Sequence, residues 1–90
     1  MATFIAVASF SETDLPLIRT VIAEEVAQVG VLTAEGRLKG VHVSPTRGRV
    51  FLEVIAESEE EAKATVETLP MSQWWEIDVY PTMGPPDQQG

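Results

Sequence analysis

Two hydrophobic periods alternate along this chain of 90 residues, and their order limits the folds that it can adopt. Four stretches have the composition or the two-residue alternation of strands, namely residues 3–10, 38–44, 49–56 and 75–80. Residues 14–32 and 59–69 instead repeat apolar side chains at the 3.6-residue period of a helix. The order βαββαβ predicts an α+β protein of the ferredoxin-like kind, in which two helices cover one face of a four-stranded antiparallel sheet.

Residues with known preferences for helix ends mark both predicted helices. Thr13 or Asp14 is suited to accept hydrogen bonds from the free amides at the start of the first helix, and Gly36 is suited to its end. Ser58 with Glu61 fits the capping box at the start of the second helix. We therefore interpret the run of three glutamates after Ser58 as helix-start chemistry and not as a metal site.

One acidic residue, Glu25, interrupts the apolar face of the first predicted helix. The apolar side chains of that face are Ile18, Ile22, Val29 and Leu32. Burial of an unpaired carboxylate is costly and raises its pKa toward the range useful for a general base. Glu25 is therefore our candidate for catalysis. In the alternative interpretation it lies at the edge of the apolar face or pairs with Arg47, Arg49 or Lys39.

The composition excludes several classes of function. The chain has no cysteine and a single histidine, so it predicts no disulfide, no thiolate chemistry and no metal centre. Its net charge of −8 disfavours nucleic acid and anionic membranes as partners. The N-terminus lacks the basic region of a signal peptide, and no apolar stretch approaches the roughly 20 residues that span a bilayer. We expect a cytoplasmic protein.

Both faces of the predicted sheet carry apolar residues. In the strand 49–56, Val50, Leu52 and Val54 alternate with Phe51 and Ile55. Two helices can cover only one face, so we expect a second copy of the chain on the other and hence at least a homodimer. We assign residues 1–82 to the folded domain and residues 83–90, with their paired prolines, to an extended tail.

Two segments carry a likeness to a known family. Residues 69–79, with the sequence LPMSQWWEIDV, match a segment of the family without a gap, and residues 24–36 match its glutamate pair and Glu-Gly helix end more weakly. On these segments the chain resembles the muconolactone isomerases, which are dimeric α+β barrel proteins. The resemblance implies a cofactor-independent isomerase that moves a proton within a small unsaturated lactone, and an oligomer as large as a decamer. It implies a base at Glu24 or Glu25, and the helical period directs Glu25 inward.

Several residues are candidates for contacts with the substrate. His42 could donate to an enolate oxygen or be an ordinary strand residue, and Arg47 and Arg49 flank a predicted hairpin turn where they could bind a substrate carboxylate. Trp74 and Trp75 are adjacent, so one should pack in the core or an interface while the other could line a pocket. The turn at 44–48 is shorter than the corresponding stretch of muconolactone isomerases, which puts the exact substrate in question.

Two further functions stay open at this point. In the first, the chain is a cofactor-free oxygenase or cyclase for aromatic, polyketide-like substrates, with Phe51, Met71 and the two tryptophans around a flat ligand. In the second, the chain is an oligomeric ligand-binding protein without catalysis, and Glu25 is an ion-pair partner. The size of the pocket distinguishes the oxygenase or cyclase from the isomerase. The effect of replacing Glu25 distinguishes the non-catalytic protein from both enzymes.

Overall fold

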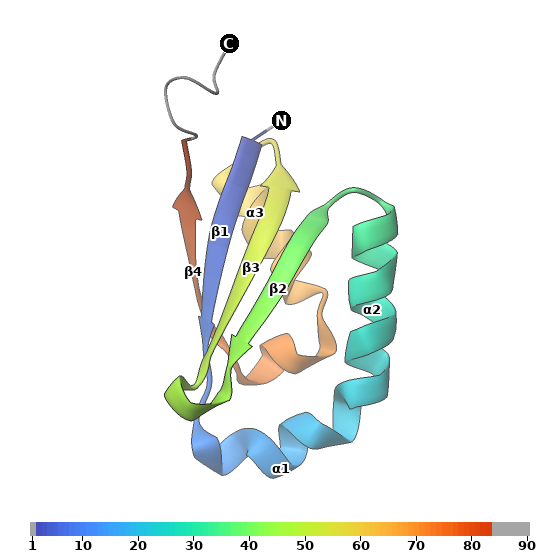
Figure 1. Cartoon of the computed structure of the whole chain (residues 1–90), viewed down its shortest axis with the longest axis vertical. Helices are drawn as coiled ribbons and strands as arrows, with labels where there is room; N and C mark the ends of the chain where they lie inside the picture. Colours follow the sequence, from blue (N-terminus) through green and yellow to red (C-terminus); the bar gives the residue numbers. More distant parts are fainter. Residues whose placement is uncertain (1, 84–90) are drawn as a thin grey trace.

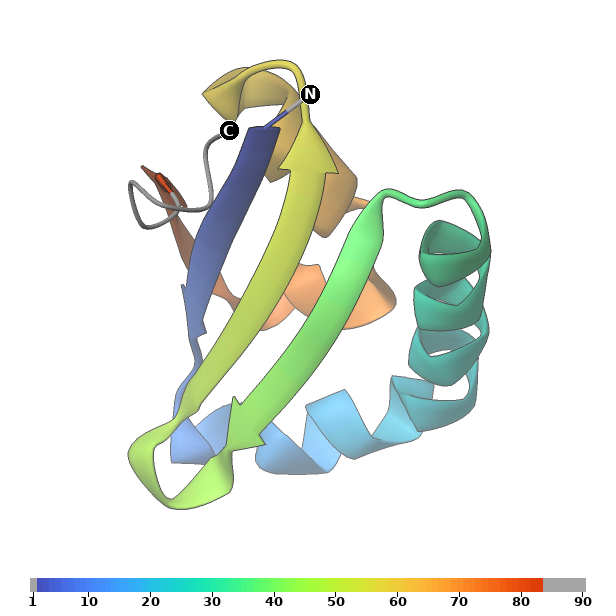
Figure 2. The same cartoon turned by 45° about the horizontal axis from the view of Figure 1, so that its top comes forward.

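A computed structural model describes residues 2–83 of the chain, and the predicted residues 84–90 of the tail lie outside this range. Four antiparallel strands form one sheet in the order β2-β3-β1-β4 (Figure 1). The strands are β1 (Ala2–Ser9), β2 (Leu38–Ser44), β3 (Arg49–Ala56) and β4 (Glu76–Pro81). The longer helices, α2 (Ile22–Ala34) and α3 (Glu59–Glu67), lie on the same side of the sheet (Figure 2). The predicted ferredoxin-like α+β fold is confirmed.

The hydrophobic core lies between the sheet and the helices. Alternate residues of β1 and β3 point into it, including Ala6, Ala8, Leu52 and Val54, none of which is exposed to solvent. The small side chains of β1 leave room for Val66 of α3 and for the residues that follow that helix. The same two-residue period that predicted the strands therefore determines which face of the sheet is buried.

The first predicted helix is divided into three consecutive elements. They are the short helix α1 (Leu15–Ile18), a 3-10 turn η2 (Arg19–Val21) and α2. At the break, the backbone of Val21 leaves the helical region with φ −114° and ψ 17°. Three consecutive β-branched residues at 20–22 have low helix propensity, and the Thr20 hydroxyl donates to the Leu17 carbonyl oxygen over 2.6 Å. The prediction of one continuous helix was wrong at this point.

Two details of the first helical region also differ from expectation. Neither Thr13 nor Asp14 caps α1; instead the Ser11 hydroxyl accepts from the Thr13 amide at a preceding 3-10 turn, η1 (Glu12–Asp14). Ile22 is 48% exposed, although the helical period had placed it on the apolar face of the helix. Ile18 and Leu32 are buried as predicted.

The hairpin between β2 and β3 contains a short 3-10 turn, η3 (Pro45–Arg47), closed by Gly48. Gly48 has φ +64°, a conformation that favours glycine, and its carbonyl oxygen accepts from the Phe10 amide over 3.0 Å. At the other end of β2, a β-bulge between Leu38 and Gly40 shifts the register. The bulge places Leu38 in the core, whereas regular alternation had predicted it on the face of His42.

The second predicted helix, α3, begins and packs as expected. The Ser58 hydroxyl accepts from the Glu61 amide over 3.2 Å, which is the first half of the predicted capping box. The Glu61 carboxylate accepts from the amide of Glu57, one residue before the cap, instead of from Ser58. Its buried residues, Ala62 and Val66, share the core with the sheet. A five-residue 3-10 turn, η4 (Pro70–Trp74), then leads into β4.

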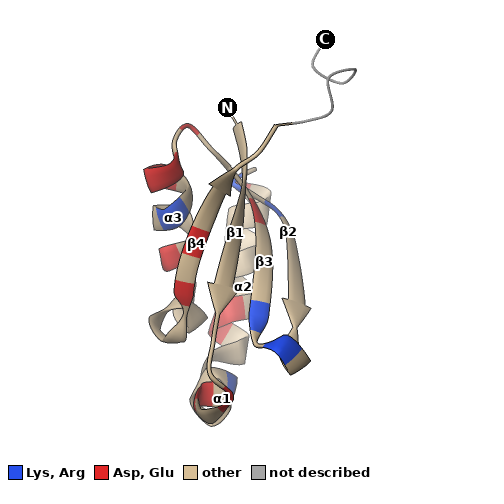
Figure 3. Cartoon of the chain, turned by 90° about the vertical axis from the view of Figure 1, so that its left-hand side faces the viewer, with Lys and Arg blue, Asp and Glu red and all other residues tan. Residues whose placement is uncertain are grey.

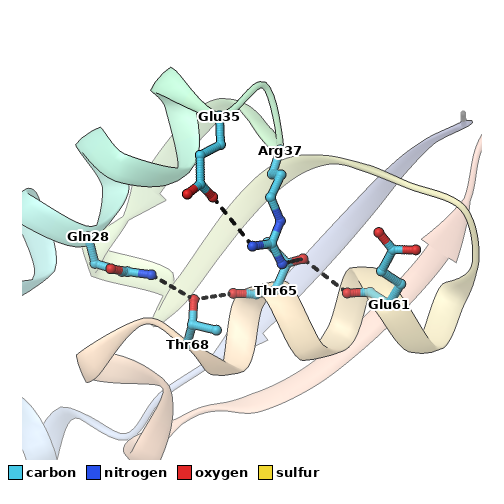
Figure 4. Close-up of polar contacts among 6 residues, drawn as sticks. All are labelled: Gln28, Glu35, Arg37, Glu61, Thr65 and Thr68. Carbon is cyan, nitrogen blue, oxygen red and sulfur yellow. Dashed lines mark hydrogen bonds and ion pairs between the residues drawn. The ribbon is translucent and has the colours of Figure 1, made fainter.

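A polar network joins the end of α2 to α3 (Figure 4). Arg37 donates to the hydroxyl of Thr65, which is 1% exposed and itself donates to the Glu61 carbonyl oxygen. One turn further along, Gln28 donates to the Thr68 hydroxyl over 3.0 Å. The ion pair of Arg37 with Glu35 lies at the surface and contributes little, so the hydrogen bonds to α3 are what hold the two helices in register.

The outer face of the sheet is covered by no part of residues 2–83. It displays Ile5, Val7, Phe51, Ile55 and Tyr80, and Phe51 and Tyr80 are 39% and 53% exposed. Acidic residues gather along α3 and β4, and basic residues at the β2–β3 hairpin (Figure 3). Within the described range, no helix has the length and apolar character required to cross a membrane.

Candidate functional site

An apolar cavity of about 360 Å³ lies between the bend that joins α1 to α2, the strands β2 and β3, and the turn η4. Its lining residues are Phe10, Leu15, Ile18, Glu25, Val26, Val29, Val41, Val43, Pro45, Val50, Met71 and Trp75. Glu25 is the single charged side chain of this lining. The break after α1 contributes to the cavity, because it turns Leu15 and Ile18 beneath the end of the hairpin while α2 forms a side wall.

Glu25 is held at the cavity wall by a hydrogen bond from another element. Its side chain is 9% exposed, and its Oε1 accepts from the Met71 backbone amide over 2.9 Å. Met71 is the second residue of η4, where backbone amides have no partner within the turn. Glu25 therefore caps η4 from α2 and fixes the distance between these two elements. The alternative of an ion pair with Arg47, Arg49 or Lys39 is not observed in residues 2–83.

The environment of Glu25 changes its acidity. Burial among apolar side chains removes water from the carboxylate and raises its pKa above the ordinary value of 4.5, and the hydrogen bond from Met71 opposes this rise only in part. Its neighbour Glu24 is exposed to solvent on the same helix. The two adjacent glutamates thus differ in environment, and the buried environment of Glu25 makes its carboxylate easier to protonate.

The second carboxylate oxygen of Glu25 is available to a ligand. No hydrogen bond to Oε2 is formed within the described part of the chain, and no buried side-chain oxygen there lacks a partner. Glu25 is one of the residues that line the cavity, and its Oε2 is not engaged by another described residue. The arrangement can therefore accept a proton from a small molecule bound against the apolar walls.

Trp75 is the predicted site residue that the structure brings together with Glu25. It directly follows η4, is half-buried, and lines the cavity together with Phe10. Its indole N–H is the single side-chain donor among the lining residues, and it forms no hydrogen bond to another residue in the range 2–83. Trp74, in contrast, lies in a separate hollow with Asp14 and Glu76.

The remaining predicted site residues lie outside the cavity. His42 and Phe51 are paired across β2 and β3 on the outer face of the sheet. Arg49 is exposed and donates to the carbonyl oxygens of Arg47 and Gly48 over 3.1 and 3.3 Å. Arg47 lines a shallow hollow next to the cavity, together with the oppositely charged Glu12. Their roles in substrate binding stay predictions.

Most of the cavity wall was not singled out by the sequence. Val41, Val43 and Val50 follow from strand alternation as inward residues, but the pattern does not distinguish a filled core from a cavity wall. The Met71 amide was also missed as the partner of Glu25. The signal that could have identified it is Pro70, because a proline that opens a helical turn is followed by a free backbone amide.

Compared with known proteins, the sequence matches no protein-family model, and no curated protein matches it significantly. The resemblance to muconolactone isomerases therefore stays a prediction. Residues 2–83 contain no group of three or more acidic or histidine side chains placed to hold a metal ion. Fold and site together define a small α+β protein of the ferredoxin-like kind whose apolar cavity contains one carboxylate.

Proposed function

We propose that the chain is a cofactor-independent isomerase that moves a proton within a small unsaturated lactone, with Glu25 as the base. The observation that supports this proposal most directly is a largely buried carboxylate, with one oxygen free of hydrogen bonds to residues 2–83, in the lining of an otherwise apolar cavity. A base with a raised pKa is well matched to a carbon acid, because it is stronger than an ordinary carboxylate and is regenerated in each cycle.

The proposed reaction is a balanced transfer of one proton. In a conjugated butenolide, the Glu25 carboxylate removes the proton from the γ carbon, and the electron pair of that bond spreads over the ring as a dienolate. The protonated Glu25 then returns the proton to the α carbon, next to the carbonyl group. The double bond has moved to the β,γ position and the carboxylate is restored, so no further reactant is required.

The dienolate places negative charge on the carbonyl oxygen, and in our proposal Trp75 stabilises this charge. Trp75 lines the same cavity as Glu25, and its indole N–H has no acceptor among the described residues. A hydrogen bond in a site without water is more effective than the same bond in solvent. In this proposal Glu25 moves the proton, Trp75 binds the carbonyl oxygen, and the apolar walls exclude water.

The size of the cavity favours the lactone over the aromatic alternative. Ligand pockets span about 300–1,000 Å³, and a cavity of about 360 Å³ lies near the lower end of that range. A single five-membered ring with a short substituent suits this volume better than a fused polyketide. The oxygenase or cyclase function is therefore our second candidate, supported by the aromatic walls Phe10 and Trp75.

We further propose that the protein acts as a homodimer or a larger homo-oligomer in which the outer faces of two sheets pack together. The apolar residues of this face lie on three adjacent strands, and nothing in residues 2–83 covers them. Sheet-to-sheet packing buries such a face at the usual separation of stacked sheets. This pairing would give the dimeric α+β barrel that the resemblance implies.

The experiment that tests the isomerase proposal follows two butenolides in D₂O by NMR. The two are muconolactone and its γ-methyl analogue, in which a methyl group replaces the carboxymethyl group. We expect the wild type to isomerise at least one of them and to incorporate deuterium at the α carbon. Glu25→Gln should lower the rate by about 10²–10⁴-fold, the usual contribution of a general base.

Two further variants make this result specific. Glu24→Gln removes the same charge from the exposed neighbour on α2 and should retain the wild-type rate. Glu25→Leu that keeps the fold and abolishes turnover would exclude the interpretation of Glu25 as an assembly residue. Absence of both isomerisation and exchange in the wild type, with either lactone, would refute the isomerase proposal.

A further inference from the structure

The charges of the residues that line the cavity indicate the charge of the ligand that it can bind. Eleven of its twelve lining residues are uncharged, and the twelfth, Glu25, is an acid. No lysine, arginine or histidine of residues 2–83 lines this cavity. A ligand carboxylate inside it would lie close to the like charge of Glu25, among apolar walls that offer it no counter-ion, and this is an unfavourable environment for an anion.

The nearby arginines do not supply the missing positive charge. Arg49 does not line the cavity, and one nitrogen of its guanidinium donates to the carbonyl oxygens of Arg47 and Gly48 in its own hairpin. Arg47 lines the neighbouring hollow and shares it with Glu12, whose charge opposes its own. That hollow shares Phe10, Leu15 and Pro45 with the cavity, so these three residues lie between Arg47 and the space beside Glu25.

We infer that the cavity selects an uncharged lactone, a butenolide with an alkyl substituent, over one that bears a carboxylate. This inference rests on the proposed function, because it names the substrate class for the same site. Muconolactone itself is an anion at neutral pH, so its reaction at this site should be poor even if the proton transfer is the same. The discrimination arises from Glu25 and the uncharged walls together.

The first measurement compares kcat/KM for the γ-methyl butenolide and for muconolactone with the wild type. We expect the uncharged lactone to be preferred by about 100-fold or more, because an unpaired buried charge is strongly disfavoured. Equal values, or a preference for muconolactone, would overturn the inference and leave Glu25 as the base. The two parts of the proposal therefore fail separately.

The second measurement separates binding from turnover. Saturated lactones cannot isomerise, so γ-valerolactone and its carboxymethyl analogue report only on binding, which ligand-observed NMR detects. We expect γ-valerolactone to bind and its anionic analogue to bind at least about tenfold more weakly. Preferential binding of γ-valerolactone without turnover of any butenolide would support the inferred ligand charge and remove the isomerase proposal. Absence of binding by both would overturn the inference.

A variant that adds a positive charge should reverse the preference. Val26 lines the cavity and is 66% exposed, so an arginine there can reach the ligand without being buried. Val26→Arg should raise kcat/KM for muconolactone relative to the γ-methyl butenolide by about tenfold or more. Val31→Arg places the same charge on α2 at an exposed position outside the cavity and should leave the ratio unchanged. An equal response of the two variants would overturn the inference.

Discussion

Glu25 combines a structural and a chemical role in one side chain. Its Oε1 caps η4 through the Met71 amide, and its Oε2 forms no hydrogen bond to another described residue. Glu25 also lines the apolar cavity. The hydrogen bond orients the carboxylate, and the surrounding apolar side chains raise its pKa. A carboxylate that had formed an ion pair would have the opposite shift and would be a weaker base. The chemistry that we propose therefore depends on the absence of a cation near Glu25 among the described residues.

The raised pKa of Glu25 predicts how stability depends on pH. Because the folded state favours the protonated form, it binds more protons than the unfolded state once the pH exceeds the ordinary pKa of 4.5. The free energy of unfolding of the wild type should therefore fall, relative to that of Glu25→Gln, as the pH rises from about this value through the raised pKa of the folded state. At higher pH the difference should become constant.

Urea denaturation of the wild type and Glu25→Gln across this pH range measures the effect. Other carboxylates contribute equally to both proteins and cancel in the difference. A wild-type stability that rises with pH relative to Glu25→Gln would show that Glu25 is stabilised as a carboxylate, contrary to its environment in this structure.

Among the elements, the β2–β3 hairpin depends on particular residues at its turn. Pro45 opens η3, and Gly48 closes it in the left-handed region with φ +64°. A methyl group added to Gly48 would lie 2.7 Å from the Phe10 carbonyl oxygen, a contact that forces the chain to shift. Since Phe10 and Pro45 both line the cavity, this tight junction also positions one end of the site.

Gly48→Ala should therefore destabilise the protein by about 1–3 kcal/mol, from left-handed backbone strain and the contact with Phe10. Gly30 provides a matched control in the middle of α2, where an added methyl group meets nothing within 4 Å. Gly30→Ala should stabilise by about 0.5–1 kcal/mol, because alanine favours the helix. Urea denaturation of both variants tests the pair, and equal stability changes would contradict the prediction.

The elements also show where local sequence is sufficient to predict structure. The bounds of β2 and β3 agree with the prediction, because the turn 45–48 marks one end of each strand. The bend near Val21 was not predicted, since apolar periodicity continues across it even though three β-branched residues disfavour the helix there. The bulge at Lys39 similarly leaves no mark in the alternation of side chains.

For the site, the sequence predicted the inward direction of Glu25 but not its partner. The helical period is a local property, and it places Glu25 with Val29 and Leu32. The contact with the Met71 amide joins residues 46 positions apart and depends on how η4 packs against α2. The position of His42 and Phe51 on the outer face followed from alternation, whereas their distance from Glu25 required the complete fold.

At the scale of the whole molecule, one face of the sheet lacks a cover. Cross-strand pairing places Phe51 of β3 between Val7 of β1 and His42 of β2 on the outer face. The same face also carries Glu53 and Asp78. A chain of this length buries only about 60% of the surface exposed by its unfolded state, so covering this face would add substantially to a thin core. Formation of the proposed dimer should therefore raise the free energy of unfolding of the protein.

Phe51→Glu should convert the proposed dimer to a monomer, because it would bring a carboxylate from each copy into the proposed interface in place of two aromatic rings. Sedimentation velocity over a range of concentrations measures the change. Val31→Glu adds the same charge at an exposed position on α2 and should leave the dimer intact. A wild type that sediments as a monomer, or a Phe51→Glu variant that stays dimeric, would show that the outer face of the sheet is not the interface.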